Sequence, residues 1–147
     1  MDPIAELEAD HRPLAEQLDH LDALAAGRPA PASREALGQA LRQEIDVHSR
    51  QEEVPVLPAL AAHGLDAGRL RGLTADHAAL RRALGACGRV RAAGGPQWQR
   101  PAGRITALPR AHLRIENERV FPGARQLLLG AEQDAVAAAF GTVHGGA

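Results

Sequence analysis

Length, composition and charge narrow the classes of protein that this chain can belong to. Its 147 residues fit one domain with a sizeable core, and the balance of 45% hydrophobic and 24% charged residues excludes a disordered or membrane-like chain. The formal net charge is −1 and no strongly basic patch stands out, so nucleic acid is not expected as a partner.

Helical periodicity runs through most of the chain. Apolar or histidine side chains recur every three or four residues over four long segments, residues 4–21, 37–52, 70–87 and 105–120, and a weaker pattern covers 132–140. No alternating strand pattern of useful length occurs. The sequence therefore predicts an all-α fold, an antiparallel up-down four-helix bundle with a short C-terminal fifth helix. We expect one domain over residues 1–147, with the bundle core at about 3–125 and an extension over 126–147.

Local signals refine this prediction. Ser33 and Asp66 are suitable N-caps for the second and third segments. Pro55 and Pro109 fall inside predicted helices, where each removes a backbone donor and clashes with the preceding turn, so we expect a kink or local break at each. In the fourth segment, the apolar stripe is predicted to contain Ile105, Leu108, His112, Ile115 and Glu116.

One pattern of histidine, glutamate and proline is written twice. HSRQEEVPVLP begins at residue 48 and HLRIENERVFP begins at residue 112, so His, Glu and Pro recur at the same offsets. A second pattern, Asp-His-x-x-Leu-x-x-x-Leu, begins at residue 10 and again at residue 76. Each half of the chain is therefore predicted to be a helix-turn-helix unit that carries two histidines and one glutamate.

These polar side chains fall on the faces that the bundle buries. Residues i and i+4 share one helix face, so His48 with Glu52, and His112 with Glu116, continue the apolar stripes of their helices, and His11 and His77 each take the place of a leucine. A lone buried histidine is more often a hydrogen-bonded core residue, but two matched sets are not explained in that way. Four imidazoles around two carboxylates suit a metal centre, which would neutralise the buried charge.

On these residues the sequence resembles the hemerythrin-like, or HHE cation-binding, domain family, whose pattern is H…HxxxE…H…HxxxE. The resemblance covers residues 3 to about 125 and implies a non-haem di-iron centre, with two iron ions and an oxo or hydroxo bridge. It implies that Glu52 and Glu116 bridge the irons. It further implies that His11 and His48 bind one iron and that His77 and His112 bind the other.

The chain departs from the oxygen-carrying hemerythrins, which have a further histidine one turn from the first on the third helix. Here Leu73 and Arg81 stand at those positions, and neither can be that ligand. This argues against reversible oxygen carriage. Glu53 is expected on a solvated face, with a supporting or replacement ligand as the alternative, and Asp10 and Asp76 are expected to face away from the centre.

Neighbouring classes of metalloprotein fit less well. Ferritin-like di-iron bundles use Glu-x-x-His on two helices and a glutamate from each of the others, a spacing that this chain lacks. Structural zinc sites usually contain cysteine, and this chain has only Cys87. That lone cysteine favours a reducing cytoplasm and is predicted to be a packed side chain, and neither a signal peptide nor a membrane span is evident.

Two functions follow as hypotheses. The first is a binding or sensing module for O₂ or NO, in oxygen, oxidative or nitrosative stress, which as a sensor would need a protein partner. The second is a di-iron enzyme that consumes hydrogen peroxide. Iron storage is the weakest hypothesis, because two metal ions per chain is a poor capacity.

Overall fold

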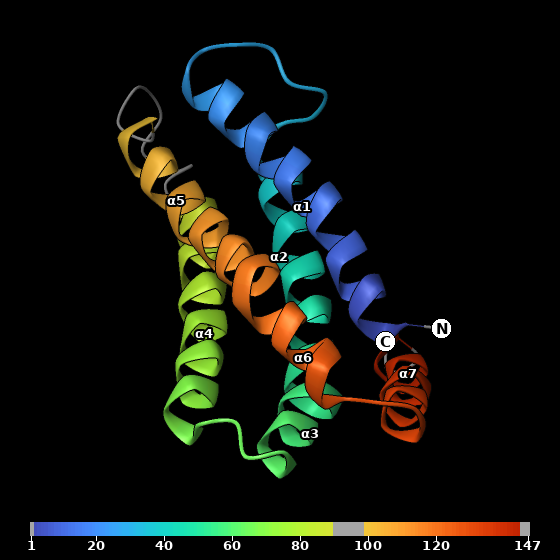
Figure 1. Ribbon diagram of the computed structural model, residues 1–147. Coiled ribbons are helices and arrows are strands. Elements are labelled where there is room, and N and C mark those ends of the chain that lie inside the picture. Colours follow the sequence, from blue (N-terminus) through green and yellow to red (C-terminus); the bar gives the residue numbers. More distant parts are fainter. Residues whose placement is uncertain (1, 90–98, 145–147) are drawn as a thin grey trace.

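The computed structural model describes residues 2–89 and 99–144, and the described residues form an all-helical fold (Figure 1). The elements in chain order are α1 (Pro3–Ala25), α2 (Arg34–Gln51), η1 (Glu52–Val56), α3 (Leu57–Ala62), α4 (Ala67–Arg89), α5 (Gln99–Ile115), η4 (Glu116–Val120), α6 (Phe121–Leu127) and α7 (Ala131–His144). The segments η1 and η4 are π-helical turns, so α2–η1–α3 and α5–η4–α6 are two continuous rods.

Four long helical units make the bundle. Helix α1 packs against α2 and α5, and α4 packs against the same two, with successive units running in opposite directions (Figure 1). This confirms the predicted antiparallel up-down bundle. The predicted fifth helix is present as α7, which is longer than the expected 132–140 and lies beside the N-terminal end of α1 (Figure 1).

The predicted helix boundaries rest on side-chain caps. Ser33 Oγ accepts a hydrogen bond from the Ala36 backbone N–H at 3.2 Å, and Asp66 Oδ2 accepts one from the Arg69 N–H at 3.0 Å. These bonds satisfy donors that have no partner inside α2 and α4, which confirms both predicted N-caps. Just before Asp66, Gly64 ends α3 with a φ of 80°, a conformation that glycine adopts readily.

The apolar core is divided in two by a polar layer. One cluster fills the end of the bundle near α3, α6 and α7, and includes Ile4, Leu60 and Phe121. The other fills the end near the α1–α2 connection, and includes Leu18 and Leu41. Between these clusters lie the buried polar residues of the bundle interior: His11, His48, Glu52, His77, His112 and Glu116. The two clusters therefore shield this layer from both ends.

The fourth helix buries only part of the face that was predicted. Leu108 and Ile115 are 36% and 40% exposed, whereas Pro109, His112 and Glu116 are buried. Steps of three and four residues from Pro109 lead to His112 and Glu116, so the buried stripe is centred there and Leu108 and Ile115 lie at its edges. The side chains of Ile105 and Cys87 lie outside the described residues.

The prolines inside helices have different outcomes. Pro55 lies within the π-helical turn η1, so a local break in the α-helical pattern occurs there as predicted. Helix α5 continues through Pro109 without interruption, so the local break that was predicted there does not occur.

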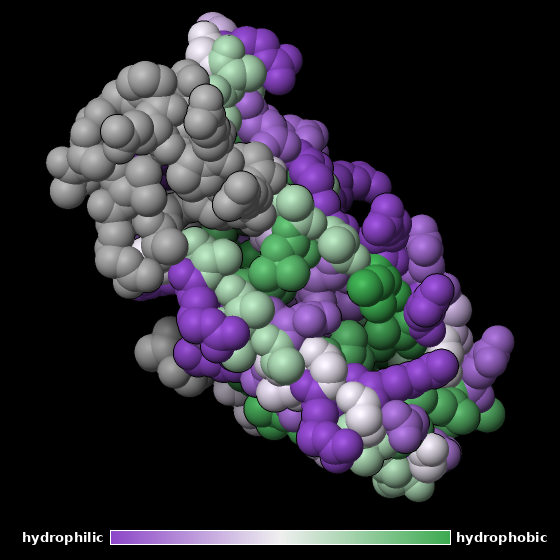
Figure 2. Space-filling view, turned by 90° about the vertical axis from the view of Figure 1, so that its left-hand side faces the viewer, coloured by the Kyte–Doolittle hydropathy of each residue, from purple (hydrophilic) through white to green (hydrophobic). Residues whose placement is uncertain are grey.

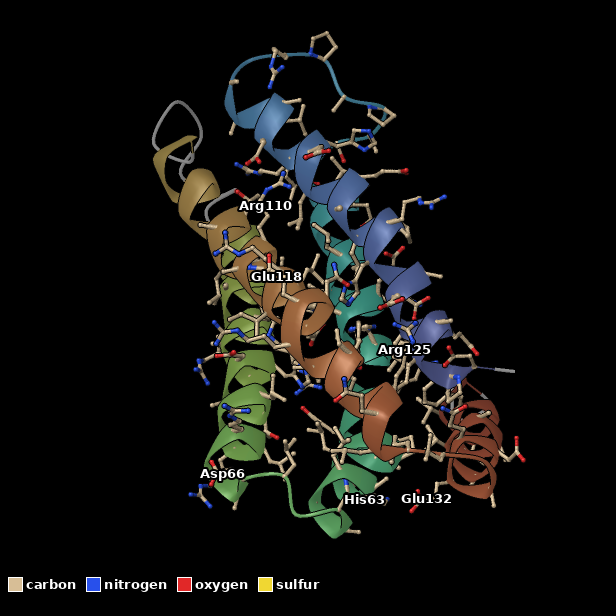
Figure 3. All side chains as sticks on the ribbon, in the orientation of Figure 1. His63, Asp66, Arg110, Glu118, Arg125 and Glu132 are labelled. Carbon is tan, nitrogen blue, oxygen red and sulfur yellow. The ribbon has the colours of Figure 1, made fainter. Side chains whose placement is uncertain are left out.

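Charged pairs join α1 to the rod that contains α5 and α6, and Figure 3 labels the two arginines that form them, Arg110 and Arg125. Arg110 Nη2 lies 2.8 Å from Asp22 Oδ2, and Arg125 donates two hydrogen bonds of 2.7 Å to the Glu8 carboxylate. His63 pairs with Glu132 at 2.7 Å and joins the end of α3 to α7. Exposed pairs of this kind stabilise by about 1 kcal/mol or less each, so the clusters of apolar residues dominate the stability. In the described part of the chain, no helix is long and apolar enough to cross a bilayer.

Candidate metal centre

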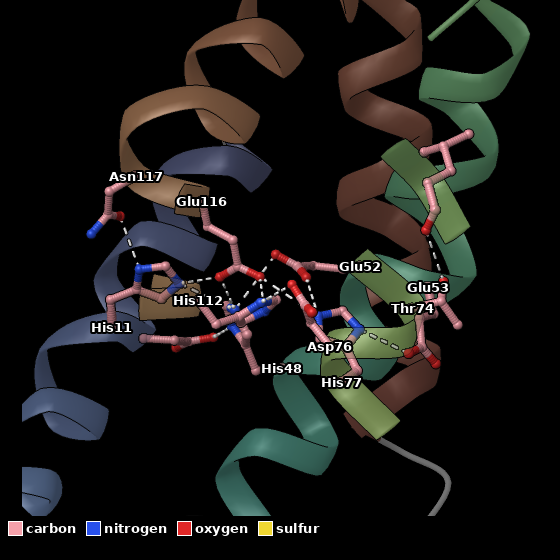
Figure 4. A network of polar contacts seen from close by, with 12 residues as sticks. His11, His48, Glu52, Glu53, Thr74, Asp76, His77, His112, Glu116 and Asn117 are labelled. Carbon is pink, nitrogen blue, oxygen red and sulfur yellow. Dashed lines mark hydrogen bonds and ion pairs between the residues drawn. The ribbon is translucent and has the colours of Figure 1, made fainter. Parts of the chain in front are cut away.

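All six residues that the sequence singled out meet in the polar layer (Figure 4). The histidines come from the four long helices, His11 from α1, His48 from α2, His77 from α4 and His112 from α5. The glutamates Glu52 and Glu116 are the first residues of the π-helical turns η1 and η4. Each is at most 5% exposed.

The carboxylate of Glu116 lies at the middle of the cluster. Its Oε2 is 2.9 Å from His11 Nε2 and 3.3 Å from His48 Nε2. Its Oε1 contacts His112 Nε2 and is 3.6 Å from His77 Nε2. One carboxylate therefore faces all four imidazoles, two through each oxygen.

The carboxylate of Glu52 lies beside it. Its Oε2 is 2.9 Å from His77 Nε2, and its Oε1 is 3.5 Å from His48 Nε2. Because His48 belongs to the first half of the chain and His77 to the second, Glu52 also contacts both halves.

The π-helical turns place a buried glutamate and a buried apolar residue on the same side of each rod. The Leu57 N–H bonds to the Glu52 carbonyl, and the Phe121 N–H bonds to the Glu116 carbonyl, each across five residues instead of four. The wider turn places Leu57 and Phe121 on the same side as the glutamate five residues earlier, and both are buried in the apolar cluster near α3 and α6.

The repeated prolines lie directly after the two π-helical turns. Pro58 and Pro122 stand in the first turn of the α-helices that follow η1 and η4. Proline has no N–H donor, and the hydrogen-bond pattern changes from five-residue to four-residue spacing at this point, so the missing donor is tolerated. The sequence showed the repeat, but not the π-helical turns that it specifies.

Each histidine is also contacted on its outer nitrogen. His11 Nδ1 is 2.9 Å from Asn117 Oδ1, and His77 Nδ1 is 2.8 Å from Glu53 Oε1. Both partners are acceptors, so Nδ1 of each ring donates to them and Nε2 faces the centre.

The other two histidines are approached by aspartates. Asp10 Oδ2 lies 3.7 Å from His48 Nδ1, and Asp76 Oδ2 lies 3.5 Å from His112 Nδ1. These aspartates lie outside the ring of donor atoms, and each reaches from the helix of one histidine to the next helix of the bundle.

Two supporting residues need separate comment. Glu53 was expected on a solvated face, but its side chain is only 25% exposed and pairs with His77. Sequence reasoning missed Asn117 entirely. The signal was present in the repeat, because Glu53 follows Glu52 as Asn117 follows Glu116, and the two residues contact equivalent histidines.

The donor atoms fit a metal better than they fit one another. Glu52 Oε1, His77 Nε2, His112 Nε2 and Glu116 Oε1 are buried and lie close to oppositely charged atoms, but none of the four makes a hydrogen bond of good geometry. Orphaned buried polar atoms are costly, and nitrogen and carboxylate donors that converge on shared space suit a divalent metal. Within the described residues two such groups form, one of Glu52, His77, His112 and Glu116 and one of His11, His48 and Glu116, with the donor atoms of each group within 4.8 Å of one another.

Comparison with protein families agrees with this geometry. The model of the hemerythrin HHE cation-binding domain matches residues 2–138. The chain belongs to the hemerythrin family. Neither the curated proteins nor the solved structures that were compared with it give a significant match. The family and the buried His/Glu cluster together indicate a metal-binding domain, and the family makes iron the expected metal.

This hemerythrin domain lacks the further histidine of the oxygen carriers, as the sequence predicted. Leu73 is 8% exposed and packs in the apolar cluster near α3 and α6. Arg81 Nε pairs with Asp46 Oδ1 at 3.2 Å. Both positions one turn from His77 are thus filled by side chains that cannot bind a metal.

The charges of the hemerythrin cluster are strongly coupled. Burial lowers the pKa of His48, but Asp10 and Glu116 outweigh it and raise the pKa to about 10. Burial likewise opposes protonation of His77, yet Glu116 and Glu52 raise its pKa to about 10. Burial and the Glu116 charge raise the pKa of Glu52, whereas the imidazoles overcome burial and hold the pKa of Glu116 well below its usual range.

A pH dependence follows for the metal-free protein. Histidines whose pKa rises from about 6.5 when unfolded to about 10 when folded add stability that is complete below pH 6.5 and is lost as the pH rises through 10. We therefore expect the free energy of unfolding, measured with urea in the presence of a chelator, to fall between pH 6.5 and pH 10. The chain has no tyrosine, so few other groups titrate in this window.

The control for this prediction is a variant with both His48→Gln and His77→Gln. The pH slope of its unfolding free energy should be much flatter than that of the natural chain. Equal stability of the natural metal-free chain at pH 6.5 and pH 10 would contradict the assigned protonation.

Proposed function

We propose that this hemerythrin-family chain holds a non-haem di-iron centre that binds O₂, NO or a related small ligand. The observation that carries the proposal is the convergence of four imidazole Nε2 atoms on two buried carboxylates, with two of the imidazoles fixed from outside by Asn117 and Glu53. Bound iron would supply a redox-active Lewis acid with positions open to small ligands.

The contacts support a proposed role for each ligand. His11 and His48 would hold one metal ion, and His77 and His112 the other. Glu116 is the candidate bridge, since it belongs to both groups of donors, and Glu52 contacts one histidine of each pair. A carboxylate shared by two cations is also the arrangement that best offsets the burial of its negative charge.

The surroundings favour a small apolar ligand. A void of about 10 Å³ lies against His48 and His112, and the rest of its lining includes Leu14, Ile45 and Leu80. A void of that size is close to the minimum for a single water molecule, and its apolar walls offer water few hydrogen bonds. Diatomic molecules such as O₂ and NO make smaller demands on polar partners.

The direct test is the visible spectrum of the iron-loaded, chemically reduced protein before and after exposure to O₂ and, separately, to NO without air. New absorption bands that depend on the gas are expected. A spectrum unchanged by either gas would contradict this function, even if iron is bound.

The second candidate function is disproportionation of hydrogen peroxide to water and O₂, a reaction that needs no other reductant. The observation that favours it is the pair Leu73 and Arg81, which leaves the His77 side of the centre without the further histidine of oxygen carriers. Both metal positions would then admit a ligand. The test is oxygen release from peroxide by the iron-loaded protein compared with the metal-free protein. Equal rates for the two forms would exclude it.

The two metal positions should differ in affinity. One donor group has four members and the other has three. In addition, His77 donates to the carboxylate of Glu53, whereas His11 donates to the amide oxygen of Asn117. A carboxylate partner makes an imidazole a stronger ligand, so the first metal ion should bind at the His77 and His112 position.

Titration with Co²⁺, followed by its visible absorption, should therefore show two steps. Glu53→Gln should weaken the first step by about tenfold. Asn117→Ala is the matched variant for the other half and should weaken only the second step. If Glu53→Gln leaves both steps unchanged, Glu53 does not distinguish the two positions.

A further inference from the structure

A cavity of about 300 Å³ lies beside the metal centre, between α4 and the rod formed by η4 and α6. Its apolar lining includes Leu73, Ile115 and Val120, and its charged lining residues are Arg69, Arg119 and Asp76. Asp76 is the residue that approaches His112, and Leu73 lies one turn from His77, so the cavity adjoins the His77 and His112 side of the centre. Its volume is at the lower end of small-molecule sites and far exceeds the space that a diatomic gas needs.

Two helix-interior glycines keep this cavity open. Gly72 in α4 and Gly123 in α6 both line it, and a Cβ atom added at either position would meet no atom within 4 Å. Neither has a positive φ, so the backbone does not require glycine there. Glycine inside a helix destabilises the fold by about 1 kcal/mol relative to alanine. At these two positions the missing side chain leaves space that the cavity occupies.

The cavity also leaves apolar surface uncovered. Ile115 is 40% exposed, and it is one of the few large hydrophobic side chains exposed in the described part of the chain. Figure 2 shows hydrophobic residues reaching the surface between hydrophilic ones on the face that it presents. An organic ligand in the cavity would cover apolar surface of this kind.

The charge of the cavity selects the kind of ligand. Arg69 and Arg119 are exposed, and within the described residues neither guanidinium has an ion-pair partner. Some other arginines of the bundle are paired, for example Arg110 with Asp22 and Arg125 with Glu8. The one carboxylate in the lining, Asp76, is turned toward His112. Two unpaired cations and several apolar side chains in one lining favour an anion with an apolar body.

We propose that this cavity binds a small carboxylic acid, with its apolar body against Leu73, Ile115 and Val120 and its carboxylate at Arg69 and Arg119. The proposal concerns a site apart from the metal donors and does not depend on which metal the protein holds. A ligand bound there would lie next to Asp76 and so beside the metal centre.

The experiment is calorimetric titration of the full chain with octanoate, with 1-octanol and octylamine as probes of the same apolar length. Octanoate should bind more tightly than either. Arg69→Gln and Arg119→Gln should each weaken octanoate binding by about fivefold, as expected for a partly exposed ion pair. Octylamine or 1-octanol binding as tightly as octanoate would overturn the assignment to carboxylic acids.

Filling the cavity gives an independent test. Gly72→Leu should abolish octanoate binding, because the new side chain would occupy the cavity. Gly85→Leu is the matched control, since Gly85 is in the same helix α4, also has no atom within 4 Å of an added Cβ, and does not line the cavity. Circular dichroism establishes that both variants fold. Octanoate binding that survives in a folded Gly72→Leu variant, or no octanoate binding by the natural chain, would overturn the proposal.

Discussion

Glu116→Gln should abolish binding of both metal ions at once. Glu116 is buried and contacts all four histidines, two through each carboxylate oxygen, so it is the residue that both donor groups share. Glutamine keeps the size of the side chain but lacks the negative charge that two cations would share. Loss of that shared charge weakens both donor groups, because Glu116 belongs to each of them.

Glu52→Gln is the graded comparison. Among the described residues, Glu52 pairs with two histidines, His48 and His77, and it belongs to one of the two donor groups. Its replacement should lower metal content less than the replacement of Glu116. His20→Ala is the control, because His20 belongs to neither group. Metal content of the purified variants, measured by elemental analysis, decides the matter, and an unchanged content in Glu116→Gln would refute the assigned bridge.

Removing the metal should lower the melting temperature by a large amount. Without a cation, the cluster leaves buried donor atoms without hydrogen-bond partners, and its carboxylates are balanced only by protonated imidazoles. A ligand that binds only the folded state stabilises it by about 2.7 kcal/mol at a hundred times its dissociation constant. For a chain of this length, that corresponds to roughly 5–10 °C.

The measurement is calorimetric melting of the iron-loaded protein and of the same protein after chelation, both at pH 7. His63→Ala provides a comparison, because it removes a pair with Glu132 at the surface and leaves the centre intact. The variant should show the same difference between loaded and metal-free forms as the natural chain. Identical melting temperatures of the loaded and metal-free natural protein would mean that the metal lies outside the buried layer.

Most of the fold and the six central residues could be predicted because the sequence repeats itself. Helical period placed His11 and His77 where leucines would otherwise stand, and burial followed from that placement. The face of α5 was predicted less well. Leu108 and Ile115 are apolar, as core residues usually are. The buried stripe of the helix is centred on Pro109, His112 and Glu116, however, so Leu108 and Ile115 lie at the edges of that stripe.

The contacts of Asp10 and Asp76 could not be predicted, because they join residues from different helices. Asp10 and Asp76 point away from the donor atoms of their own helices, and only the packing of adjacent helices brings them to His48 and His112. The π-helical turns were also hidden, since no residue type marks a five-residue hydrogen bond as clearly as proline marks a turn. In the sequence, these turns are marked only by the repeated glutamate that begins each turn and the repeated proline that follows it.

We propose that each chain holds two metal ions between its two halves. The most direct measurement is the number of iron ions per chain after anaerobic loading and removal of free iron, read together with the visible spectrum in air. We expect about two irons per chain and absorption bands from iron linked to oxygen, because two donor groups share Glu116. One iron or fewer per chain, with no such bands, would contradict the di-iron centre.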